Sequence, residues 1–130
     1  MSQLILGWGQ TGMSIAQFFD DSGFNDYKIW DDLISDIKPE KKEENPLNIN
    51  NYDKIYVSPG VPPTHPLILQ SADTDKNIDV ETDLDLFFDT HKELKLKIIG
   101  ITGTNGKTTC AELLKEVLTN SGFSVEICAN

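Results

Sequence analysis

Short apolar runs alternate with helix-type spacing along the first two thirds of the chain. Runs at residues 3–6, 28–30, 55–57 and 78–81 are rich in aliphatic and β-branched side chains and predict strands. Apolar residues at helical spacing follow three of these runs, at residues 15–19, 67–69 and 84–88, and predict helices. This alternation predicts an α/β fold, a Rossmann-like parallel sheet with flanking helices.

A second pattern begins after a charged segment at residues 91–95. Ile98–Thr102 predicts a buried strand, residues 113–118 predict a helix, and Ser124–Cys128 predicts one more strand. We expect a domain boundary here, with a nucleotide-binding domain over 1–93 and the start of a second, phosphate-binding domain over 94–130. Because a parallel sheet needs several strands to be covered on both faces, we expect this second domain to be incomplete.

The first strand runs into a glycine-rich loop. Residues 7–12 match G-x-G-x-x-G between a predicted strand and a predicted helix, and Asp31 lies 19 residues after Gly12. That spacing is typical of the acid that binds a ribose hydroxyl in dinucleotide-binding folds. A tight turn that serves only close packing is the alternative, and Asp32 could equally be a solvated loop residue.

A second glycine loop joins the run at 98–102 to the following helix. It holds Gly103 and Gly106 and continues into Lys107-Thr108. Glycines let backbone N–H groups turn toward an anion, a helix start adds partial positive charge, and a Lys-Thr pair suits phosphates and Mg²⁺. The generic phosphate loop has glycine where this chain has Ile101, so the loop is a variant of that pattern.

The turn after the third strand, residues 58–63, is rich in proline and contains Gly60. Ligands in open α/β sheets gather at such carboxyl ends of strands. His65 precedes Pro66 at a predicted helix start, where a local hydrogen-bonding role is favoured over catalysis. Thr82 and Asp85 predict a capping box for the helix that follows.

Composition limits the classes of partner. The net charge of −10 argues against a nucleic-acid partner, which needs a basic face. No apolar run approaches the length that spans a membrane, and the first residues lack the basic region of a signal peptide. We therefore expect a cytoplasmic protein without membrane insertion.

Taken in order, five segments resemble the Mur ligase family, and the likeness extends over essentially the whole chain. The segments are Gly7-Trp8-Gly9-Gln10-Thr11-Gly12-Met13-Ser14, Val57-Ser58-Pro59-Gly60-Val61-Pro62, His65-Pro66, Thr82-Asp83-Leu84-Asp85-Leu86-Phe87 and Gly103-Thr104-Asn105-Gly106-Lys107-Thr108-Thr109. The first two favour the family member that adds D-glutamate. The resemblance implies an ATP-dependent amide ligase of peptidoglycan synthesis, with UDP-N-acetylmuramoyl-L-alanine and D-glutamate as substrates and an acyl phosphate as intermediate.

The resemblance also implies roles for individual residues. The UDP-substrate site would comprise Gln10, Thr11, Asp31, Asp32, Gly60 and Asn130. The ATP site would comprise Gly103, Thr104, Asn105, Gly106, Lys107, Thr108 and Thr109, with Lys107 catalytic and Thr108 a Mg²⁺ ligand. Leu33 stands where the family often has arginine or another polar residue. Family members are expected to be monomers, whereas a fragment could self-associate through exposed strand edges.

Other functions are consistent with parts of the pattern. A sibling ligase that adds a different amino acid is one alternative, because the resemblance assigns amino-acid choice to a third domain. The first glycine loop with Asp31 would also suit a NAD-binding oxidoreductase domain, which leaves Lys107-Thr108 without a purpose. A nucleotide-sensing or scaffold module is a third alternative. We expect the chain to be a fragment that cannot ligate alone.

Overall fold

The computed structural model describes residues 2–34, 36–44 and 49–128. It divides into two compact units, Met1–Leu94 and Lys95–Asn130, which we call unit 1 and unit 2. No helix among the described residues has the length and apolar character that crossing a membrane requires.

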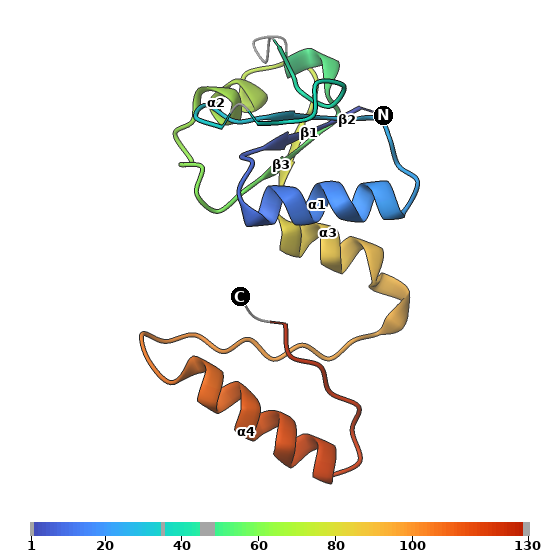
Figure 1. The fold of residues 1–130 in the computed structure, drawn as a ribbon, viewed down its shortest axis with the longest axis vertical. Helices are drawn as coiled ribbons and strands as arrows, with labels where there is room; N and C mark the ends of the chain where they lie inside the picture. Colours follow the sequence, from blue (N-terminus) through green and yellow to red (C-terminus); the bar gives the residue numbers. More distant parts are fainter. Residues whose placement is uncertain (1, 35, 45–48, 129–130) are drawn as a thin grey trace. The chain divides into compact units, whose positions relative to one another are not determined.

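Unit 1 is built on a four-stranded sheet in which every pairing is parallel (Figure 1). The strands are β1 (Gln3–Leu6), β2 (Tyr27–Trp30), β3 (Lys54–Val57) and β4 (Asp79–Glu81), in the order β2-β1-β3-β4. Leu6 pairs with Trp30 on one side and with Val57 on the other, so three strands end at one edge of the sheet. The loops that leave these strand ends are therefore neighbours.

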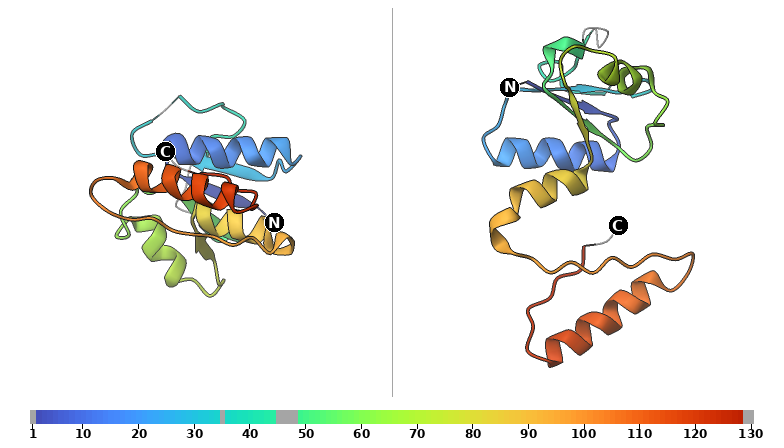
Figure 2. Two further views of the ribbon diagram at one scale, coloured as in Figure 1. Left: turned by 90° about the horizontal axis from the view of Figure 1, so that it is seen from below. Right: turned by 180° about the vertical axis from the view of Figure 1, so that it is seen from behind.

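Helices cover both faces of the sheet. Figures 1 and 2 show α1 (Gln10–Asp21) and α2 (Pro66–Ala72) on opposite faces. Side chains alternate accordingly, because successive residues of a strand point to opposite faces. Leu4 and Leu6 belong to a cluster that includes Leu67 of α2, whereas Ile5 belongs to a cluster with Ile15 of α1. The short 3₁₀ helix Ile49–Asn51 lies on the α2 side, since Ile49 joins the first cluster.

Helix α3 (Asp83–Thr90) follows β4 directly and begins with a reciprocal cap. The Thr82 hydroxyl accepts the Asp85 N–H, and the Asp85 carboxylate accepts the Thr82 N–H. The predicted capping box is confirmed. A 3₁₀ turn, Lys92–Leu94, then ends unit 1. The four predicted strands of this unit, its three predicted helices and the α/β Rossmann-like fold class are confirmed.

Unit 2 contains one helix, α4 (Lys107–Asn120), among its described residues. The strands predicted at Ile98–Thr102 and at Ser124–Cys128 are wrong, because neither segment is paired with another strand. Ile98 and Ile99 are exposed, not buried. A strand exists only through hydrogen bonds to a neighbour, which an apolar β-branched run cannot supply by itself. Of residues 95–128, none is buried.

Candidate functional site

The first glycine loop lies between β1 and α1, at the edge where three strands end. Gly7 has φ +97°, and a Cβ there would lie 2.8 Å from the Cβ of Ser58. A Cβ on Gly12 would lie 2.1 Å from the carbonyl oxygen of Gly7. Both positions require glycine, Gly7 for its backbone conformation and for the approach of Ser58, and Gly12 for the approach of α1 to the loop.

The start of α1 presents free backbone donors. Gly9 is the N-cap and provides no side-chain cap, and the first helical bond runs from the Met13 N–H to the Gly9 carbonyl. Gln10 is exposed and Thr11 is half-buried on this first turn. Unpaired N–H groups at a helix start, together with the helix dipole, suit a phosphate.

The loop after β2 is joined to the glycine loop by Asp31. The Trp8 N–H donates to its Oδ2 (2.7 Å), while the N–H groups of Leu33 and Ile34 donate to its Oδ1 (2.8 and 2.7 Å). Partial burial raises the pKa of Asp31, but these three donors outweigh it and leave the pKa below its ordinary value. Asp31 therefore acts as a structural acceptor that holds two loops together.

Asp32 is held differently. The indole Nε1–H of Trp30 donates to its Oδ1 (2.8 Å), and the His65 ring lies 2.8 Å from its Oδ2. Both contacts hold the pKa of Asp32 below its ordinary value, the Trp30 bond being the stronger cause. The Asp32 side chain is still 58% exposed. The two adjacent acids therefore differ: Asp31 bonds to the backbone of two loops, whereas Asp32 remains accessible to solvent.

The loop after β3 completes this edge. The Ser58 hydroxyl donates to the Gly7 carbonyl (2.9 Å), which ties the loop to the glycine loop. Gly60 is exposed, and a Cβ there would meet no atom within 4 Å. The structure brings the loops that carry Gln10, Thr11, Asp31, Asp32 and Gly60 to one edge of the sheet. Asn130 lies outside the described residues.

Sequence reasoning missed the contact between His65 and Asp32. His65 is the N-cap of α2, where its Nδ1 accepts the Leu67 N–H (3.2 Å), as the local role predicted for it implies. The second contact joins residues 33 positions apart. No local pattern in the sequence reveals it, although a histidine beside a strand-end loop was a signal that this edge contains polar partners.

In unit 2 the second glycine loop leads into α4. Gly103 (φ +156°) and Gly106 (φ +77°) have backbone conformations that favour glycine, and Gly106 is the N-cap without a side-chain cap. The Lys107 Nζ donates to the Gly103 carbonyl, so the ammonium group lies over the loop. Residues 103–109, which include Thr104, Asn105, Thr108 and Thr109, are all exposed.

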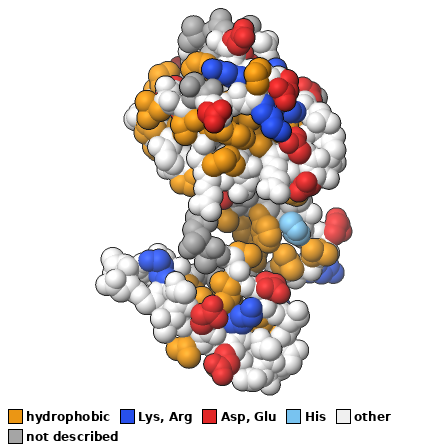
Figure 3. All heavy atoms as spheres, viewed as in Figure 1, with side chains coloured by type: hydrophobic (Ala, Val, Ile, Leu, Met, Phe, Trp, Pro, Cys, Tyr) orange, Lys and Arg blue, Asp and Glu red, His pale blue; other side chains and the backbone are white. Residues whose placement is uncertain are grey.

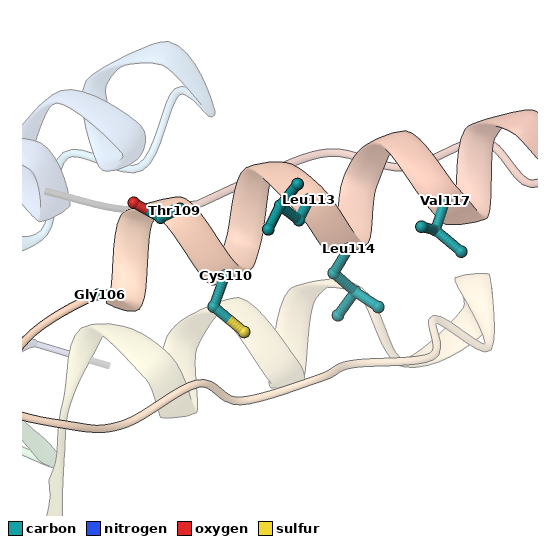
Figure 4. A pocket seen from close by; sticks show the side chains of 6 residues that line it. All are labelled: Gly106, Thr109, Cys110, Leu113, Leu114 and Val117. Atoms are coloured by element: carbon teal, nitrogen blue, oxygen red, sulfur yellow. The ribbon is translucent and has the colours of Figure 1, made fainter.

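One side of α4 forms an open apolar surface beside this loop. Figure 4 shows the side chains of Cys110, Leu113, Leu114 and Val117 along the helix, with Gly106 and Thr109 at its start. Leu113 and Val117 are each about 60% exposed. Exposed hydrophobic side chains on both units are visible in Figure 3. Across the described residues, no group of three or more His, Cys, Asp or Glu side chains could hold a metal ion.

Comparison with known proteins gives one consistent result. The chain is 35% identical to the UDP-N-acetylmuramoylalanine–D-glutamate ligase of Rickettsia prowazekii over 97% of its own length and 29% of the ligase. It is 32% identical to the ligase of that name from Buchnera aphidicola and 31% identical to that of Syntrophus aciditrophicus, over 98% of the chain and 30% of each relative. Nearly the whole of this chain is therefore similar to a part of these Mur ligases.

The chain thus spans about 30% of the length of the Mur ligases that it matches. No protein-family model matches it. The glycine loops, the strand-end edge of unit 1 and the start of α4 all fall within the matched length, because the match extends over nearly all of this chain.

Proposed function

We propose that the chain forms the UDP-substrate-binding domain and the beginning of the ATP-binding domain of a cytoplasmic ligase. The ligase would add D-glutamate to UDP-N-acetylmuramoyl-L-alanine in peptidoglycan synthesis. The observation that carries this proposal is the similarity of nearly the whole chain to ligases named for that reaction. A sibling that adds another amino acid is less well supported, because the relatives described above share the D-glutamate name.

Unit 1 is the proposed UDP site. Its three strand-end loops lie at the switch point of the sheet, where β1 separates β2 from β3, and open α/β sheets bind ligands there. The free N–H groups at the start of α1 suit a diphosphate. Gln10, Thr11 and Gly60 would line the site together with Asp31 and Asp32. The resemblance also gives Asn130, which lies outside the described residues, a role in binding this substrate.

Unit 2 is the proposed start of the ATP site. The positive-φ glycines and the uncapped start of α4 fit a phosphate-binding loop over Gly103–Thr109. Lys107 would exchange its bond to the Gly103 carbonyl for one to a phosphate, which makes it the proposed catalytic cation. The Thr108 hydroxyl would supply one oxygen ligand to Mg²⁺, which neutralises phosphate charge when bound.

The proposed reaction is ATP-dependent amide formation. The substrate carboxylate would take the γ-phosphoryl group of ATP to become an acyl phosphate, with ADP as the leaving group. The amine of D-glutamate would then displace phosphate to form the amide. Such transfers depend on positioning and on charge neutralisation more than on covalent help from the protein. The first glycine loop would hold the UDP end of the substrate, and Lys107 would stabilise charge on the phosphates.

Titration calorimetry of the purified chain with UDP, ATP–Mg²⁺ and NADH tests the proposal. We expect saturable UDP binding and no saturable NADH binding. Lys107→Ala should weaken ATP binding and leave UDP binding unchanged, since the lysine belongs to the second loop. Saturable NADH binding without UDP binding would contradict the proposal and favour a NAD-binding oxidoreductase domain.

We also propose that this chain by itself does not ligate. It matches less than a third of each relative described above, and the remainder would carry the amino-acid site and further metal ligands. A coupled phosphate-release assay with UDP-N-acetylmuramoyl-L-alanine, D-glutamate and ATP should show only background. Turnover above background would disprove this part of the proposal.

A further inference from the structure

His65 uses both of its ring nitrogens, one within the start of α2 and one toward the loop after β2. Its Nδ1 accepts the Leu67 N–H at the start of α2, so the ring proton resides on Nε2. Nε2 lies 2.8 Å from Oδ2 of Asp32 in the loop after β2. A neutral His65 therefore caps α2 and donates to Asp32 at the same time.

The result is a carboxylate of fixed direction at an accessible position. Asp32 receives one donor from His65 and one from the Trp30 indole, which lie on different elements. The His65 side chain is 9% exposed and that of Asp32 is 58% exposed. Each carboxylate oxygen has two lone pairs, so each retains one for another donor.

The neighbouring acid has less of this capacity. Asp31 already accepts three backbone N–H groups and acts as a brace between loops. Beside Asp32, Leu33 is 94% exposed and offers an apolar surface. Of the two acids after β2, Asp32 is the one placed to meet a ligand.

We propose that His65 is a positioning residue of the nucleotide site. It orients Asp32 to accept a hydroxyl or ring N–H of a nucleoside, and the fixed negative charge disfavours a phosphate on the ribose. This inference rests on the proposed function, since it assumes that unit 1 binds a nucleoside diphosphate.

Two substitutions separate the two contacts of His65. His65→Asn keeps an acceptor near the position of Nδ1 and caps α2, but it is too short to reach Asp32. His65→Gln extends a donor toward the position of Nε2. We expect His65→Asn to keep its thermal stability and to bind UDP about three- to tenfold more weakly, as the loss of one orienting hydrogen bond implies. His65→Gln should recover part of this loss.

A double-mutant cycle distinguishes positioning from a merely structural role. In an Asp32→Asn background, His65→Asn should cause no further loss of UDP affinity, because the residue it orients is already changed. The indole N–H resonance of Trp30 should shift in His65→Asn, since Trp30 donates to the same carboxylate.

Two modified ligands identify the group that donates to Asp32. 2′-Deoxy-UDP lacks the ribose 2′-hydroxyl, and N3-methyl-UDP lacks the ring N–H. The affinity of the ligand without the donating group should be insensitive to Asp32→Asn.

Three outcomes would overturn the inference. If His65→Asn binds UDP as tightly as the native chain, His65 does not position Asp32. If the losses of the two single variants add fully in the double variant, His65 acts independently of Asp32. If the native chain binds no UDP at all, the proposed function fails and the inference fails with it. The first two outcomes, in contrast, overturn the inference and leave the proposed function standing.

Discussion

Asp31 shows how one carboxylate can hold two neighbouring loops in place. Its two oxygens accept N–H groups from the glycine loop and from the loop after β2. A carboxylate accepts at both oxygens, whereas an amide accepts at one and donates at the other. The geometry therefore depends on the carboxylate and not only on the size of the side chain.

We predict that Asp31→Asn destabilises unit 1 by about 1–2 kcal/mol, because at least one N–H donor loses its acceptor. Denaturant unfolding measures this change. Asp36→Asn is the matched control, since Asp36 is exposed in the same loop. An equal free energy of unfolding for Asp31→Asn and the control would contradict the prediction.

The same prediction has a pH dependence with a definite sign. The folded state lowers the pKa of Asp31, so its stabilising contribution is complete above the pKa of the unfolded chain, about 3.9. The contribution is lost as the pH falls through the lower folded-state pKa. The difference between native and Asp31→Asn chains should therefore be constant near neutrality and shrink below about pH 4.

At this scale, spacing along the sequence selected Asp31 as a candidate ribose-binding acid, and that role stays a prediction. Spacing did not predict the three backbone donors that Asp31 accepts in the folded chain. His65 was predicted to bond locally, which its cap on α2 confirms. Its contact with Asp32 depends on how two distant loops meet, and spacing along a chain contains no such information.

At the scale of elements, β3 and the edge strand β4 are joined by an ion pair as well as by the sheet. Lys54 pairs with Glu81, and these side chains are only 22% and 18% exposed. The Lys54 ammonium also lies 5.7 Å from the centre of the Tyr56 ring. Removal of the lysine would leave the Glu81 carboxylate largely desolvated and without its cation.

We predict that Lys54→Met lowers the free energy of unfolding by about 1–3 kcal/mol, chiefly because the Glu81 carboxylate loses its ion-pair partner. The double variant Lys54→Met/Glu81→Gln should recover part of that loss. Lys76→Met is the control, because the Lys76–Asp53 pair is more exposed and should change stability by less than about 1 kcal/mol. Equal losses in Lys54→Met and Lys76→Met would show that burial of the pair is unimportant.

The strands and helices predicted from the sequence formed where a neighbouring element was present to pair or pack with them. The run at residues 3–6 became a central strand with a neighbour on each side, and the helix-type spacing after it became α1. The run at 98–102 has an equally strong apolar, β-branched character, yet it forms no strand. Periodicity is a property of one segment, whereas strand pairing needs a second segment at the right distance. Both wrong strand predictions therefore fall in unit 2, where the described residues include no paired strand.

At the scale of the whole molecule, the two units differ in what stabilises them. Unit 1 contains two clusters of buried apolar side chains, one on each face of its sheet. Within unit 2, the described residues include none that is buried, and α4 presents Leu113 and Val117 to solvent. An isolated helix of this length is marginally stable in water because nucleation is costly, and the described residues of unit 2 include no buried side chain to offset that cost.

We therefore predict that backbone amides of α4 exchange with solvent at least about 10³-fold faster than those of β1, relative to their unfolded rates. Exchange in β1 requires unfolding of unit 1, whereas exchange in α4 requires only loss of the helix. Hydrogen–deuterium exchange followed by mass spectrometry or NMR measures both in one sample. Leu4→Ala should accelerate exchange in β1 and leave α4 unchanged, whereas Leu113→Glu should leave β1 unchanged. Equal protection of α4 and β1 in the native chain would mean that the units unfold together, and the exposed side of α4 would then contribute to a common stability.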